Sequence, residues 1–213
     1  MAGTTVVDSF ALVINHITAD QRDALSRRLN SLAPGLNAAE IALIRAQAES
    51  ALLEHAHLKL NRLLLLELHA AVRSGTITAT DNAEQFAQFV QLATHPDFSA
   101  HLDQRYPALR PRFQQMLAAQ CNAVEELATR IVADRDDFPA LLGRPAGQLV
   151  SVSLGKGDLH SQGRTVARLV FEGGPLMYKP RSLRIDATLD AFLGAVFGDV
   201  PDRVGVARGI DRA

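Results

Sequence analysis

The residues with the clearest potential for chemistry lie in one basic segment, residues 143–184. It holds seven Lys or Arg side chains and two acids, Asp158 and Glu172, a formal charge of +5 in a chain whose total is −1. The seven bases are Arg144, Lys156, Arg164, Arg168, Lys179, Arg181 and Arg184. Glycines beside such charges let backbone amides approach an anion closely, as in phosphate-binding loops. The segment therefore indicates an anion site, although a solvated hairpin edge kept soluble by Arg and Lys explains the same residues.

An acid and an imidazole, Asp158 and His160, stand two residues apart in a glycine-containing turn of this segment. A carboxylate and a His of near-neutral pKa can work as acid and base, or share a metal ion. The pair alone is weak support, because Asp also caps turns by accepting backbone amides. The turn begins like the dinucleotide motif G-x-G-x-x-G but has His160 in place of the last Gly, and no G-x-x-x-x-G-K-[ST] occurs in the chain.

Strands of a small β module must position these residues. Residues 148–154 alternate, which predicts a strand with Val150, Val152 and Leu154 on one face. Residues 165–171 predict a second strand, and Gly173 with Gly174 predicts a tight hairpin turn into a third strand at 176–179. A proline follows Lys179 and ends that strand. Helical spacing then predicts a helix from about residue 185.

The first 142 residues have the apolar spacing of helices, interrupted by residues that typically begin or end a helix. A long helical stretch is expected between residues 37 and 75, another over 86–93, and a third after Pro111. Capping-box spacing at Thr18, Asn37 and Asp81, each followed three residues later by Gln or Glu, predicts three helix starts. We therefore expect an α+β chain: a helical block, residues 1–142, then a small antiparallel β module and a helix, residues 143–213.

Composition excludes several classes of function. A hydrophobic fraction of 47% over 213 residues suits a globular chain, and a net charge of −1 argues against a general nucleic-acid binder or a polybasic membrane-surface protein. The densest apolar run, residues 63–66, is too short to cross a bilayer, and no signal peptide is evident, so we expect a cytoplasmic location. The single Cys121 excludes an internal disulfide and is expected to be a core residue.

Three strings in the β module together resemble the dehydration domain of class II (LanM-type) lanthipeptide synthetases. Residues 157–166 read GDLHSQGRTV, against a family pattern close to G-D-x-H-x-x-G-R-x-V. A strand over 169–171 follows, and residues 178–183 read YKPRSL, as in the family. Helical lead-in segments at residues 63–69, 86–90 and 106–109 also match, so the resemblance extends from about residue 50 to 195.

The resemblance implies a lipid-kinase-like fold and a two-step dehydration. Such enzymes use ATP and Mg²⁺ to phosphorylate Ser and Thr of a precursor peptide, and then eliminate the phosphate to leave dehydroalanine or dehydrobutyrine. The resemblance implies that Lys179 is the lysine that binds the nucleotide phosphates, and that Asp158 and His160 act in turnover of the phosphorylated intermediate. The further candidates for cofactor binding are Gly157, Gly163, Arg164 and Arg181, and no metal ligand is assigned.

The sequence also departs from the family. The family's catalytic loop, with its Asp, His and Asn and a later metal-binding Asp, lies beyond residue 213, as does a cyclase domain that binds zinc. We therefore expect a fragment or a truncated reading frame that is inactive alone. The alternative is a non-catalytic helical module whose basic hairpin captures a peptide or a phosphate.

Overall fold

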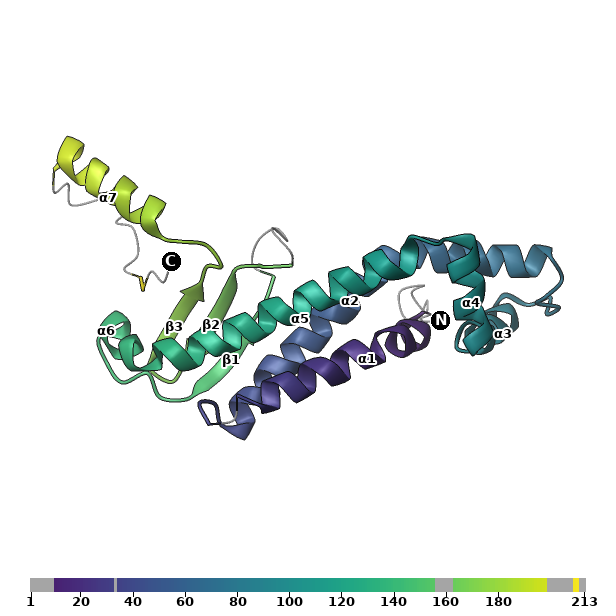
Figure 1. Ribbon diagram of the computed structural model, residues 1–213, viewed down its shortest axis with the longest axis horizontal. Helices are drawn as coiled ribbons and strands as arrows, with labels where there is room; N and C mark the ends of the chain where they lie inside the picture. Colours follow the sequence, from purple (N-terminus) through teal and green to yellow (C-terminus); the bar gives the residue numbers. More distant parts are fainter. Residues whose placement is uncertain (1–9, 33, 156–162, 199–208, 211–213) are drawn as a thin grey trace. The chain divides into compact units, whose positions relative to one another are not determined.

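The protein has an α+β fold, as the sequence predicts. The computed structural model describes residues 10–32, 34–155, 163–198 and 209–210. No helix within these ranges is long and apolar enough to cross a membrane. The elements, drawn in Figure 1, are α1 (Ala11–Asn30), α2 (Ala38–Arg73), α3 (Asn82–Ala93), α4 (Pro96–Arg105), α5 (Leu109–Asp134), the 3₁₀ turn η2 (Arg135–Asp137), α6 (Phe138–Leu142), β1 (Leu149–Ser153), β2 (Ala167–Phe171), β3 (Gly174–Tyr178) and α7 (Arg184–Phe197).

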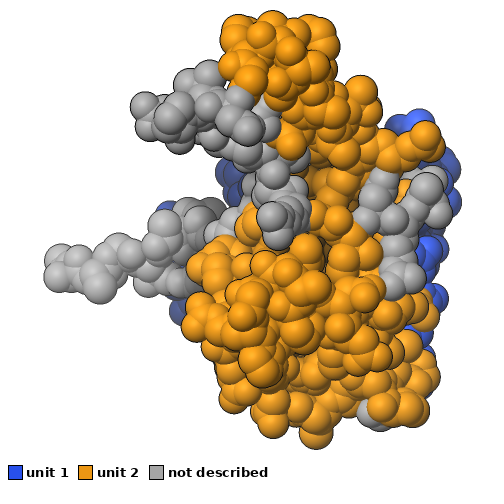
Figure 2. All heavy atoms as spheres, turned by 90° about the vertical axis from the view of Figure 1, so that its left-hand side faces the viewer, with its two compact units in different colours: residues 1–28, 48–122 blue, residues 29–47, 123–213 orange. Residues whose placement is uncertain are grey.

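The chain divides into two compact units, which Figure 2 distinguishes by colour. The first comprises residues 1–28 and 48–122, and the second comprises residues 29–47 and 123–213. Helices α2 and α5 contribute residues to both units. The β-sheet and all the basic residues of segment 143–184 belong to the second unit.

The first unit has a core of edge-to-face aromatic rings. The ring centroids of Phe10 lie 5.5 Å from Phe86 and 5.8 Å from Phe89, and Phe89 lies 5.7 Å from Phe98. Such tilted contacts suit the quadrupoles of aromatic rings and add to the burial of apolar surface. Cys121 is buried here with a free thiol, so its prediction as a core residue is confirmed.

Two of the three predicted helix caps are present. Asn37 and Glu40 exchange backbone–side-chain hydrogen bonds of 3.0 Å, which is a complete capping box at the start of α2. Asp81 caps α3 by accepting two backbone amides. The prediction for Thr18 was wrong, because this residue lies inside α1 and its hydroxyl donates to the Ile14 carbonyl at 2.8 Å. Buried apolar residues upstream of Thr18 extend the helix beyond the local capping signal.

The sheet is antiparallel in the order β1-β2-β3. The register of β1 against β2 shifts between Leu149 and Ser151, which marks a β-bulge or irregularity. An extra residue in one strand moves the side chains beyond it to the opposite face. Val152 is therefore buried whereas Val150 is 49% exposed, so the prediction that these two valines share a face was wrong.

The hairpin between β2 and β3 is confirmed, but its loop lies one residue earlier than predicted. Phe171 pairs with Gly174, so the two loop residues are Glu172 and Gly173, and Gly174 begins β3. A Cβ atom on Gly173 would overlap the backbone carbonyl of Pro145, which explains the need for glycine at this position.

One face of the sheet packs on helices of the same unit. Ala167, Leu169 and Phe171 of β2 point to this face and are buried, and the Phe171 ring lies 5.1 Å from that of Phe138 in α6. The C-terminal half of α5 is linked to the segment before β2 by the hydrogen bond from Arg164 to Glu126. The packing fixes the position of β2, β3 pairs with β2, and the described candidate residues flank these two strands.

Candidate anion-binding site

The candidate residues gather at one end of the sheet because of its topology. Ser153, the last residue of β1, pairs with Arg168, and Ala167, the first residue of β2, pairs with Tyr178, the last of β3. The chain therefore leaves β1, enters β2 and leaves β3 at the same end, where Arg164 precedes β2 and Lys179 follows β3. Gly157, Asp158 and His160 fall in residues 156–162, outside the described residues.

Lys179 and Arg181 share one carboxylate. The Lys179 Nζ atom lies 3.8 Å from Asp186 Oδ1, and Arg181 Nη2 lies 3.2 Å from the same oxygen. Asp186 belongs to the first turn of α7, where the helix dipole favours an acid. The lysine and arginine side chains remain 40% and 54% exposed, so a dissolved anion can reach both.

Sequence reasoning missed Asp186. Asp186 lies five residues after Arg181 and seven after Lys179. Because α7 begins between these cations and the acid, the spacing follows neither a helical nor a strand period. The position became informative only once α7 was known to begin at Arg184 and to bring its first turn back toward the end of β3.

Arg164 is held by a different carboxylate. Its Nε donates to Glu126 Oε2 of α5 at 2.9 Å, and Glu126 Oε1 also contacts Arg130 Nη2 at 3.3 Å. The residue before it, Gly163, has φ of +81°, a backbone conformation that favours glycine. The two candidate cation groups thus share the sheet end but have separate anionic partners.

Two further bases of segment 143–184 that the structure describes, Arg168 and Arg144, lie apart from this group. Arg168 is exposed on the face of β2 opposite the buried residues, paired with Met177. Arg144 lies at the other end of the sheet, where its Nη2 is 4.0 Å from the position a Cβ on Gly174 would take. Among the described bases, Arg144 and Arg168 are therefore separate from the cations at the end of the sheet where Lys179 lies.

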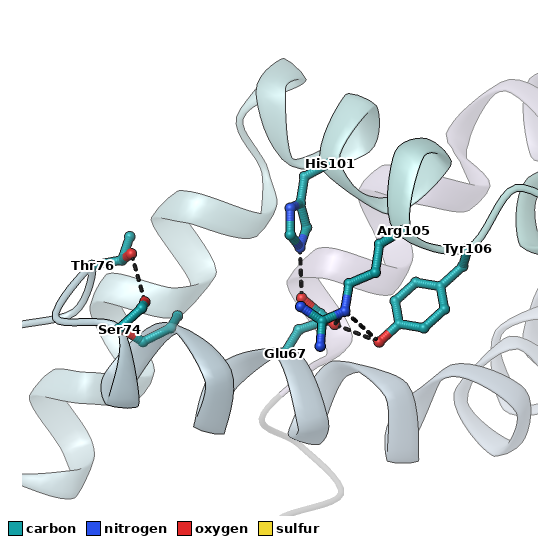
Figure 3. A network of polar contacts seen from close by, with 7 residues as sticks. Glu67, Ser74, Thr76, His101, Arg105 and Tyr106 are labelled. Carbon is teal, nitrogen blue, oxygen red and sulfur yellow. Dashed lines mark hydrogen bonds and ion pairs between the residues drawn. The ribbon is translucent and has the colours of Figure 1, made fainter.

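A second polar network lies in the first unit, around Glu67 of α2 (Figure 3). This buried carboxylate accepts the Tyr106 hydroxyl at 2.7 Å and contacts His101 Nε2 at 2.8 Å and Arg105 Nε at 3.5 Å. Burial raises the pKa of Glu67, but hydrogen bonds from Tyr106 and His101 outweigh it, so the pKa lies below its ordinary value. The network joins α2 to α4 and to the residue after α4, which is a structural role.

No metal centre is evident among the residues the structure describes. In these ranges no group of three or more His, Cys, Asp or Glu side chains could hold a metal ion. His101, for example, contacts a single acid, Glu67, whose other oxygen accepts the Tyr106 hydroxyl.

Comparison with known families gives a match in the C-terminal part of the chain. Residues 106–208 match the model of a family described as Domain of unknown function (DUF4135). The matched range includes the whole of α5, the sheet and α7, and thus both carboxylates that hold the candidate cations. No curated protein matches the chain.

Proposed function

We propose that the chain is part of a lanthipeptide-synthetase-like dehydratase, which phosphorylates Ser and Thr of a precursor peptide with ATP and then eliminates the phosphate. The motifs at residues 157–166 and 178–183 support this proposal. So does the match at residues 106–208, because that family is associated with lanthipeptide synthetase-like proteins. The observation that carries the proposal is the contact of Lys179 with Asp186 at the sheet end that Arg164 also occupies.

The order of the glycine-containing turn, the lysine and the acid along the chain agrees with the order in a protein kinase. Kinases place a glycine-rich loop over the ATP phosphates, take a lysine from the third strand, and pair this lysine with an acid on the following helix. In this chain Lys179 follows β3, Asp186 lies in the next helix, and the glycine-containing turn precedes β2. Asp186 would thus orient Lys179 toward a nucleotide phosphate.

The residues present suit the phosphates of ATP. Lys179 and Arg181 are exposed cations close together, and cations compensate the charge of phosphoryl oxygens. ATP supplies the transferable phosphoryl group when bound. The described residues give no cluster of acids for Mg²⁺, so the magnesium ion rests on the family resemblance alone. Zinc belongs to the family's cyclase domain and has no role in this proposal.

The two proposed steps balance as follows. In the first, the peptide hydroxyl oxygen bonds to the γ-phosphorus of ATP while the bridging P–O bond to ADP breaks, and the hydroxyl proton leaves to a base. In the second, a base takes the α-proton of the phosphorylated residue, the Cβ–O bond breaks, and inorganic phosphate departs. We assign Asp158 and His160 to this second step on the resemblance.

Calorimetric titration of the 213-residue chain with ATP and Mg²⁺ tests the proposal. Charge-assisted hydrogen bonds contribute about 1.5–3 kcal/mol, so Lys179→Ala should weaken binding roughly 10-fold or more. Arg144→Ala removes the same charge at the opposite sheet end and is the matched control, expected within about twofold of wild type. Equal losses in both variants, or no binding by the wild type, would contradict the nucleotide site.

The same titration distinguishes the alternative, a module that captures phosphate without chemistry. Inorganic triphosphate carries the charge of ATP but lacks the nucleoside. If triphosphate competes as well as ATP, the binding module is the better description. Preferential binding of ATP favours the kinase-like site.

A further inference from the structure

The orientation of Arg164 is set from outside the β module, by a helix. Glu126 lies in α5, 38 residues before Arg164, and accepts its Nε–H at 2.9 Å. The contact is partly sheltered, with the Glu126 side chain 27% exposed and the Arg164 side chain 41% exposed. A guanidinium has five N–H donors in a rigid plane, so a bond at Nε fixes that plane while using one donor.

Glu126 is itself held on its helix. Its other carboxylate oxygen contacts Arg130, one turn later in α5, at 3.3 Å. Residues four apart on a helix are neighbours, so this contact needs no tertiary rearrangement. The carboxylate is therefore fixed by α5 on one side and presents its second oxygen to Arg164 on the other.

The negative charge of the same carboxylate also acts on Tyr178, the last residue of β3. The pKa of Tyr178, the residue before Lys179, is raised by burial and by the negative charge of Glu126, and the charges of Arg130 and Arg164 oppose this rise. Tyr178 also pairs with Ala167 at the start of β2. Glu126 thus interacts with one residue before β2, Arg164, and with the last residue of β3, Tyr178.

We propose that Glu126 is a positioning residue of the anion site, which holds Arg164 so that its remaining donors meet a phosphate group of the nucleotide bound by Lys179. This inference rests on the proposed function. A carboxylate near an anion site also repels the anion, so its removal has two opposed effects. Positioning predicts weaker binding without Glu126, whereas repulsion alone predicts tighter binding.

A double-mutant cycle measured by calorimetry with ATP and Mg²⁺ separates these effects. Glu126→Gln should weaken ATP binding about fivefold in the wild-type background. A loss of this size lies within the range of interaction energies measured between residues in contact. In the Arg164→Ala background the same change should cause no loss, because the residue it positions is absent. Glu125→Gln, which removes the same charge from the adjacent residue of α5, serves as the control and should stay within about twofold.

Two results would overturn the positioning role. One is wild-type affinity or tighter binding for Glu126→Gln, and the other is an equal loss in both backgrounds, which indicates a general structural effect. Wild-type protein that fails to bind ATP overturns the proposed function itself, and the inference with it. Titration of Tyr178 in Glu126→Gln checks the cluster independently, because loss of the Glu126 charge should lower the pKa of this tyrosine.

Discussion

The side-chain carboxylate of Glu40 accepts a hydrogen bond of 2.9 Å from the backbone amide of Leu149, which lies 109 residues later in the chain. The same carboxylate accepts Arg135 Nη2 at 2.7 Å and the Asn37 amide at 3.0 Å. Glu40 is 1% exposed, so one buried acid joins the start of α2, the turn η2 and the start of β1. Buried charges are tolerated only when paired and hydrogen-bonded in this way.

Removing this carboxylate should strongly destabilise the second unit. Glu40→Ala leaves the Leu149 amide and the Arg135 guanidinium without their shared acceptor, and breaking a buried ion pair costs about 3–5 kcal/mol. Urea unfolding followed by circular dichroism measures the loss. Glu54→Ala, at an exposed position of the same helix, should change the free energy of unfolding by no more than about 0.5 kcal/mol. Similar small losses in both variants would show that Glu40 does not anchor the sheet.

Lowering the pH should weaken the contacts that the Glu40 carboxylate makes. Burial raises the pKa of Glu40, but hydrogen bonds from Leu149, Arg135 and Asn37 outweigh it, so the folded-state pKa lies below the ordinary value of 4.5. Such a group stabilises the fold above its unfolded pKa, and this contribution is lost as the pH falls through the folded pKa. Urea unfolding at pH 7 and pH 4 should show a smaller pH dependence for Glu40→Gln than for the wild type. An equal pH dependence of the unfolding free energy in Glu40→Gln and the wild type would contradict an ionised Glu40 carboxylate in the folded protein.

Local patterns predicted most of the fold. The alternation in residues 165–171 and the glycines after them predicted β2 and the hairpin, because both depend on neighbours in the sequence. The irregularity at Val150 could not be predicted in that way. It follows Leu149, whose amide bonds to Glu40 in a distant helix, and no local window of sequence contains both residues.

The candidate site was predictable only in part. The resemblance singled out Lys179, Arg164 and Arg181, and the sheet topology brings these residues to one end. Their partners, Asp186 and Glu126, carry no motif, because each pairing depends on how a helix packs or begins. Charge counting also overstated the basic patch, since it could not show that Arg144 lies at the opposite end of the sheet.

The Glu67 network should be visible in the titration of Tyr106. A hydrogen bond to Glu67 is the main cause that raises the pKa of this phenol above its ordinary value of 10.0, with burial second, while Arg105 opposes the rise. Glu67→Gln removes the negative charge, so the pKa of Tyr106 should fall. The absorbance of the phenolate measures the pKa of Tyr106. The measurement is made in a Tyr178→Phe background, because the chain has two tyrosines. Glu54→Gln on the same helix is the control, and an unchanged pKa in Glu67→Gln would contradict the network.

Helix α7 has an apolar surface without a buried residue. Five large apolar side chains are more than half exposed: Ile185, Leu189, Phe192, Val196 and Phe197. Isolated helices of about 14 residues are marginal in water, since most helical stability in proteins comes from packing of an apolar face. The first turn of α7 is instead attached through Asp186 to Arg181 and Lys179.

Backbone amides of α7 should therefore exchange with deuterium much faster than those of α5, which has many buried residues. Few buried contacts mean a small free energy of local opening, so we expect exchange at least about 10-fold faster, measured by mass spectrometry of peptides from each helix. Asp186→Asn should accelerate α7 further and leave α5 unchanged, whereas Asp190→Asn on the same helix is the matched comparison. Slow exchange in α7, comparable to α5, would show that its apolar face is covered in solution and would refute the prediction.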